Sequence, residues 1–134
     1  MGSSDEGFLG LRARRFRDLS AEESLSINEM VVECGVLQFP PQEDWTQRRK
    51  QRSSVGILVT FGKQTSSGAP YFIVFNLTRT GELGRYYKPP RFRSVSRLIT
   101  IAHPSAGELI TSQIDLEDHF NKAFGPDLEY PGVS

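Results

Sequence analysis

Residues 55–77 read VGILVTFGKQTSSGAPYFIVFNL, two apolar runs joined by a polar segment. In the first run Val55, Ile57, Val59 and Phe61 alternate with other residues, which is the period of a strand with one buried side. The joining segment is rich in Ser, Gly and Pro, which favour turns. The second run, residues 71–77, is apolar at nearly every position and predicts a central strand covered on both faces. The stretch therefore predicts a β-hairpin.

Weaker patterns on either side of the hairpin predict further strands. Met30, Val32, Cys34 and Val36 alternate and favour a strand that ends near Leu37, before Pro40 and Pro41. A capping box formed by Ser20 and Glu23 predicts a short helical turn ahead of this strand. The remaining expected strands cover residues 85–88, 94–102 and 108–112.

The C-terminal helix is the clearest single element. Leu116, Phe120, Ala123 and Phe124 recur at helical spacing and form one apolar stripe. Asp115 is a suitable N-cap, and Gly125-Pro126 ends the helix. The expected fold class is therefore α+β: an antiparallel sheet of about five strands over residues 30–112, with the helix over 115–124 packed on one face.

Three regions are expected along the chain. Residues 1–19 form a basic arm that can be flexible, in which Phe8, Leu11, Phe16 and Leu19 fall near one face of a short helix. Residues 20–125 form a single globular domain, since a chain of 134 residues has the size of one domain. Residues 126–134 are polar and expected to be a loose tail.

Charge is strongly segregated although the formal net charge is zero. Residues 1–45 carry four basic and nine acidic side chains, residues 46–105 eleven basic and one acidic, and residues 106–134 one basic and six acidic. The single cysteine, Cys34, excludes an internal disulfide and suits a reducing compartment. No apolar run approaches the roughly 20 residues of a spanning helix. We therefore expect an intracellular protein, cytoplasmic or nuclear, that can lie against a membrane surface.

The basic middle is the strongest functional signal. Unpaired cations must face water, and on one face of a sheet they would attract phosphates. Tyr86, Tyr87 and Phe92 lie among these cations, and rings between arginines are typical of surfaces that bind single-stranded nucleic acid. The sequence predicts a non-enzymatic module that binds RNA or single-stranded DNA as a homo-oligomer. The expected binding residues are Arg48, Arg49, Lys50, Arg52, Arg85, Tyr86, Tyr87, Lys88, Arg91, Phe92, Arg93 and Arg97, with Arg12, Arg14, Arg15 and Arg17 in the arm.

Three alternatives stay open at this point. The cations can pair internally with the acidic ends of the chain. They can bind anionic lipid in a small matrix-like structural protein, with the arm inserted in the membrane. They can also bind an acidic protein partner. No RNA-binding family motif is present; size, basic sheet and amphipathic arm are similar only in general shape to small viral matrix or nucleic-acid-associated proteins.

Catalysis, cofactors and metals receive little support. The two histidines, His103 and His119, are not placed together by any pattern, and Asp115, Asp118 and His119 match no metal-ligand spacing. No phosphate-binding glycine loop occurs. We expect no enzyme, no cofactor and no metal. Serines near the arginines are candidate phosphorylation sites that would reduce the positive charge; these are Ser53, Ser54, Ser94 and Ser96.

Overall fold

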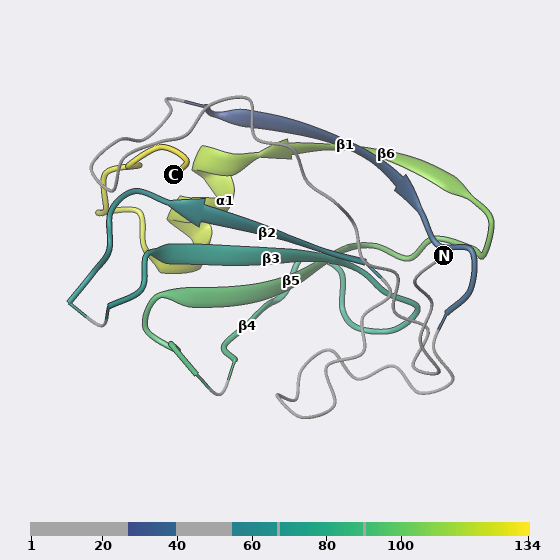
Figure 1. Ribbon diagram of the computed structural model, residues 1–134, viewed down its shortest axis with the longest axis horizontal. Helices are drawn as coiled ribbons and strands as arrows, with labels where there is room; N and C mark the ends of the chain where they lie inside the picture. The colour runs from purple at the N-terminus through teal and green to yellow at the C-terminus, as the bar shows by residue number, and fades with distance from the viewer. Residues whose placement is uncertain (1–26, 40–54, 67, 90) are drawn as a thin grey trace.

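The computed structural model describes residues 27–39, 55–66, 68–89 and 91–134, and Figure 1 shows their arrangement. The elements, in chain order, are β1 (Glu29–Gly35), β2 (Val55–Phe61), β3 (Tyr71–Leu77), β4 (Tyr86–Tyr87), β5 (Ser96–Ala102), β6 (Leu109–Asp115) and α1 (Leu116–Phe124). The α+β class is confirmed, as are the hairpin and the C-terminal helix. The expected turn at Ser20 and the arm helix lie outside the described residues.

The strands form two sheets rather than one sheet of about five strands. The larger sheet has the order β2-β3-β5-β4, and the smaller is a ribbon of β1 and β6. β2 and β3 pair antiparallel from Val55↔Leu77 to Phe61↔Tyr71. β3 and β5 are parallel, because the chain leaves β3, passes through the short β4 on the far side of β5, and returns to start β5 beside Phe72. The all-antiparallel expectation was therefore wrong at this pair.

The ribbon joins the start and the end of the sequence. β1 and β6 pair antiparallel from Glu29↔Asp115 to Gly35↔Leu109. Gly35 is required here because a Cβ atom would lie 2.4 Å from the Glu108 carbonyl oxygen. Alternation along both strands turns Met30, Val32 and Ile114 toward the rest of the protein. The ribbon therefore contributes one apolar face to a shared core.

The core lies between the four-stranded sheet and a second layer of α1 and the ribbon. Its buried side chains come from one face of β2, β3 and β5, and from β6 and α1; they are Val59, Phe61, Ile73, Phe75, Ile99, Ile114, Leu116, Phe120 and Ala123. Phe120 is central: its ring centroid lies 5.3 Å from that of Phe61, 5.5 Å from Tyr71 and 5.8 Å from Tyr130. The Asp115 carboxylate accepts a hydrogen bond from the Asp118 amide at 2.9 Å and caps α1 as expected.

The C-terminal segment, residues 126–134, forms hydrogen bonds with the end of β2. The Gly62 amide donates to the Gly132 carbonyl and the Ser134 amide to the Thr60 carbonyl, both at 3.0 Å. The Thr60 hydroxyl also donates to the Ser134 carbonyl at 2.9 Å. These bonds occupy the free edge of β2, where a strand otherwise exposes unpaired amides and carbonyls. The expected division of the chain into regions stays a prediction.

Phe120→Ala should lower the free energy of unfolding by about 3–5 kcal/mol, because the change leaves a cavity among three rings. Leu58→Ala is the matched control: Leu58 lies on the opposite face of the sheet and is 60 % exposed, so its truncation should change stability by no more than about 0.5 kcal/mol. Urea denaturation followed by circular dichroism measures both. A loss at Leu58 as large as that at Phe120 would contradict the assignment of inner and outer faces.

Candidate functional site

The charge segregation of the sequence becomes a segregation between the two layers. Among the described residues, the four-stranded sheet and its loops carry seven cationic side chains and a single acid, Glu82; the cations are Lys63, Arg79, Arg85, Lys88, Arg91, Arg93 and Arg97. The described part of the second layer and the C-terminal segment carries Lys122 against eight acids, which are Glu29, Glu33, Glu108, Asp115, Glu117, Asp118, Asp127 and Glu129. The described part of the protein is therefore electrically polar across its core.

The face of the four-stranded sheet that points away from the core, here called the outer face, carries Leu58, Thr60, Phe72, Val74, Tyr87 and Leu98. These residues alternate with core residues and oppose one another across the strands. Leu58 is 60 % exposed, Phe72, Val74 and Tyr87 are half-buried, and Leu98 is buried. The outer face is thus partly apolar, and the strand segments that form it contribute no charged side chain to it.

The loop between β4 and β5 brings an aromatic ring and two cations to this face. Phe92 has a φ of 53°, a left-handed backbone conformation that is uncommon outside glycine. Its ring is 46 % exposed and packs edge-on against Phe72, with centroids 6.4 Å apart. Its sequence neighbours Arg91 and Arg93 are both exposed. The loop therefore presents one exposed ring whose two neighbours in sequence are exposed arginines.

Buried Ser96 fixes the conformation of this loop. The Ser96 hydroxyl donates to the Phe92 carbonyl at 2.6 Å and lies 3.3 Å from the Arg91 carbonyl. The Val95 amide closes a turn on the same Phe92 carbonyl at 3.0 Å. Because Ser96 has no exposed surface, it is a structural residue, and the expectation that it is a phosphorylation site is corrected. Ser94 is exposed; Ser53 and Ser54 lie outside the described residues.

Six of the predicted binding residues lie at or beside the outer face. The Arg85 guanidinium stacks on Tyr87 at 4.8 Å from its centroid and pairs with Glu82 at 3.5 Å, with both side chains largely in solvent. Lys88, Arg91 and Arg93 are exposed, and none of the three forms an ion pair with a described residue. Internal neutralisation by the acidic layer is therefore absent for these three cations within the part of the chain that is described.

Two predicted binding residues point the other way. The Tyr86 hydroxyl lies 2.6 Å from Nδ1 of His119 on α1, and burial, with a smaller contribution from the Asp118 carboxylate, raises the pKa of Tyr86 to about 12. Arg97 stacks on Phe124 at 5.1 Å and donates to the Arg93 and Ser96 carbonyls at 2.6 Å each. Desolvation lowers the pKa of Arg97. Both side chains connect the sheet to α1 on the face opposite to the outer face; their role in binding stays a prediction.

The other predicted binding residues cannot be placed. Arg48, Arg49, Lys50 and Arg52, together with the arm residues Arg12, Arg14, Arg15 and Arg17, lie outside the described residues. The residues that sequence reasoning missed are Leu58, Phe72 and Val74. The all-apolar sequence of β3 suggested burial on both faces, whereas its outer side chains at 72 and 74 keep solvent exposure. Leu58 is apolar at a position of residues 55–61 where alternation would place a polar residue. It was therefore the sequence signal of a second apolar face.

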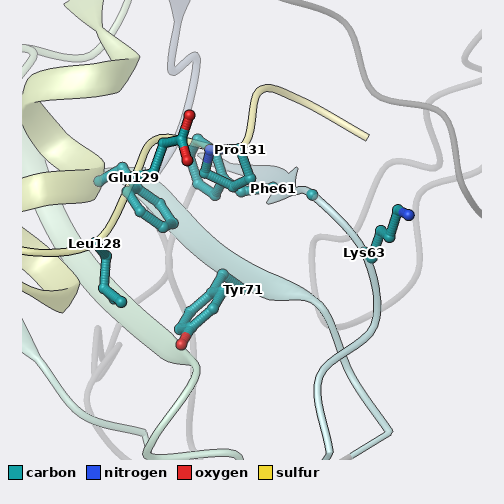
Figure 2. A pocket seen from close by; sticks show the side chains of 8 residues that line it. Phe61, Lys63, Tyr71, Leu128, Glu129 and Pro131 are labelled. Carbon is teal, nitrogen blue, oxygen red and sulfur yellow. The ribbon is translucent and has the colours of Figure 1, made fainter.

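The described residues also line hollows away from the outer face. A cavity of about 140 Å³ between α1, the β2–β3 turn and the C-terminal segment is lined mainly by Phe61, Tyr71, Phe120, Leu128 and Pro131. Figure 2 shows that Lys63 extends away from it. His103 is exposed in the β5–β6 turn, whereas His119 contacts Tyr86 and Phe75. The described residues contain no group of three or more His, Cys, Asp or Glu suited to a metal ion.

No described helix has the length and apolar character needed to cross a membrane. Comparison of the chain with protein-family models, curated proteins and solved structures gives no match.

Ser96→Ala should destabilise the protein by about 1 kcal/mol, because it removes the hydroxyl that bonds the loop carbonyls without creating a large cavity. Ser94→Ala in the same loop is the control and should change stability by no more than about 0.5 kcal/mol, since Ser94 is exposed. Urea midpoints measure both. Equal midpoints for the two variants would show that Ser96 does not hold the loop.

Stability should fall on acidification because of His119. Burial lowers the pKa of His119 below its usual value of 6.5, and Lys122 acts in the same direction, against the smaller opposing effects of Asp118 and Asp115. Below pH 6.5 the unfolded chain therefore binds a proton more readily than the folded one, so stability decreases until the pH passes the folded pKa. Urea midpoints measured between neutral pH and about pH 5 should decrease less for His119→Gln than for the wild type; parallel curves would refute this role.

Proposed function

We propose that this protein is a non-enzymatic module that binds RNA or single-stranded DNA across the outer face and the β4–β5 loop. The observation that carries the proposal is the exposed Phe92 ring, which packs on Phe72 of the partly apolar outer face and is followed and preceded in sequence by exposed arginines. Cations beside a stacking surface are what a single strand requires, because its phosphates need neutralisation and its bases need an apolar partner.

The phosphates would be bound by Lys88, Arg91 and Arg93. These side chains are exposed and lack an acidic partner among the described residues, so a guest would not have to break an existing ion pair. Each phosphate contact releases counterions, which makes affinity fall steeply with salt. Arg85 contributes less, because Glu82 already compensates part of its charge.

The bases would stack on Phe92 and on the neighbouring part of the outer face. Phe92 and Phe72 form a pair of rings near the start of β3 and β5, while Tyr87 lies on edge strand β4 under the Arg85 guanidinium. Every base has a flat apolar face, so stacking of this kind is tolerant of sequence and contributes about 1–3 kcal/mol per base. We therefore infer weak sequence preference and preference for single strands over duplexes.

The two rival functions use the same cations. Binding to anionic lipid relied on insertion of residues 8–19, which lie outside the described residues, whereas the ring between two arginines is part of the described structure. An acidic protein partner would not need the stacked rings. The aromatic component therefore favours nucleic acid over both rivals.

Arg91→Gln and Arg93→Gln should each reduce the slope of log K against log salt by about one unit, because each removes one phosphate contact. Lys122→Gln is the matched control: Lys122 pairs with Asp118 at 2.8 Å on α1, in the acidic layer, and its slope should equal that of the wild type. Filter binding of a labelled single-stranded oligonucleotide across a salt series gives the slopes. Unchanged slopes for both arginine variants would refute the proposed contacts.

Phe92→Asn separates stacking from charge in the same assay. Asn tolerates a positive φ, so the loop backbone can be kept while the ring is lost. Affinity should fall at every salt concentration with an unchanged slope. Flotation with anionic liposomes is measured in parallel to test the lipid-binding alternative. A protein that floats with liposomes but does not retain the oligonucleotide would refute the nucleic-acid function in favour of lipid binding.

A further inference from the structure

The ribbon has its own exposed face on the side of the protein that carries the acids. Its residues, here called the ribbon face, alternate with the core residues of β1 and β6; they are Glu29, Val31, Glu33, Leu109, Thr111 and Gln113. The register places Val31 opposite Gln113 and Glu33 opposite Thr111. Figure 1 shows the ribbon at the margin of the structure, beyond α1 and the larger sheet. Among the described residues, no cation lies on this face.

The ribbon face also exposes large apolar side chains. Val31 is 64 % exposed, Leu109 is 67 % exposed, and Leu37, two residues beyond the end of β1, is 90 % exposed. Single exposed apolar residues are common, and the register places Val31 and Leu109 four positions apart along the ribbon. The distinctive feature of the ribbon face is their combination with the acids Glu29 and Glu33, without a described cation. The partner's chemistry is indicated by the same residues: it should be apolar and cationic.

We propose that a second copy of this chain covers the ribbon face with its outer face. The outer face has the required complement, since Leu58 and Phe92 supply exposed apolar surface and Lys88, Arg91 and Arg93 supply unpaired cations. Contact between the two faces brings carboxylates of Glu29 and Glu33 against guanidinium groups and packs Val31 and Leu109 on apolar side chains. Complementary charge both orients such an encounter and accelerates it.

This contact is heterologous, because it joins two different surfaces. Pairing outer face with outer face would bring cations together, and pairing ribbon face with ribbon face would oppose carboxylates, so the symmetric arrangements are disfavoured. The homo-oligomer expected from the sequence would therefore be assembled head to tail. A copy that has bound one neighbour keeps an unused face for the next, so the contact extends into a chain or closes into a ring.

The inference goes beyond the proposed function, although it uses the same cations. A single-stranded nucleic acid on the outer face would exclude the neighbouring copy, and salt should weaken both contacts. The ribbon face, however, has no part in nucleic-acid binding. A substitution on the ribbon face can therefore test assembly separately.

The test uses two variants of the full chain, each of which prevents one of the two faces from binding a second copy. Val31→Lys places a cation on the exposed surface of the ribbon face and leaves the outer face intact. The double variant Arg91→Glu, Arg93→Glu reverses the charge of the outer face and leaves the ribbon face intact. All three positions lie in exposed surface, so circular dichroism should show folded proteins. Sedimentation velocity at low salt, over a wide range of protein concentration, measures the mass distribution.

The wild type should grow in mass with concentration, whereas each variant alone should stay a monomer. An equimolar mixture of the two variants should give a one-to-one dimer and nothing larger, because one intact ribbon face and one intact outer face remain. A wild type that stays a monomer at all concentrations, or a mixture that stays monomeric while the wild type assembles, would overturn the head-to-tail contact.

Oligonucleotide binding by Val31→Lys distinguishes the two proposals. Unchanged retention with lost assembly supports the ribbon face as a separate interaction surface. Assembly by the wild type together with no oligonucleotide retention would leave the head-to-tail contact standing and refute the proposed function. Oligonucleotide retention by a wild type that does not assemble would refute the head-to-tail contact and leave the proposed function standing.

Discussion

The packing of Phe120 against the inner face of the larger sheet is the contact on which the other features depend. It fixes α1 over β2 and β3, and because α1 follows β6 directly, it also positions the ribbon. Once Phe61, Ile73 and Phe75 face this helix, strand geometry obliges Leu58, Phe72 and Val74 to face the other way. The core and the two-residue period of a strand therefore place these three apolar side chains on the outer face.

The same core separates the charges. Acidic residues come from the first and last parts of the described chain, which form the ribbon, α1 and the C-terminal segment, while cations come from the middle, which forms the larger sheet. A layer of buried side chains lies between them, so most of the charges of opposite sign remain in solvent on different sides. The ion pairs at Arg85 and Lys122 are with near neighbours in sequence and do not cross the core.

The sequence was sufficient to predict the β2–β3 hairpin and α1, but not the relative direction of β3 and β5 or the face to which some side chains point. Alternation and turn residues were sufficient for the β2–β3 hairpin, and the stripe through Phe120 for α1, because these signals are local. The parallel pairing of β3 and β5 was not predictable from them, since it depends on β4 crossing to the far side of β5. The orientation of Tyr86 and Arg97 toward α1 was missed for a related reason: a shift of one residue along a strand moves a side chain to the other face. Charge identified the candidate surface but could not tell that Tyr86 would reach His119.

The two proposals give the cations of the outer face, which lack an acidic partner among the described residues, two anionic guests: a nucleic acid and the acidic ribbon face of a second copy. If both bind the outer face, each must weaken the other by the same factor, because linkage between equilibria is reciprocal. Nucleic acid would then dissociate head-to-tail assemblies, beginning at the end whose outer face is free. Assembly would in turn reduce the binding of polyanions that have only weak affinity for the outer face. The exposed apolar residues bias this competition, since Val31 and Leu109 add burial that a phosphate backbone cannot provide, while the Phe92 ring adds stacking that the ribbon face, which has no aromatic residue, cannot provide.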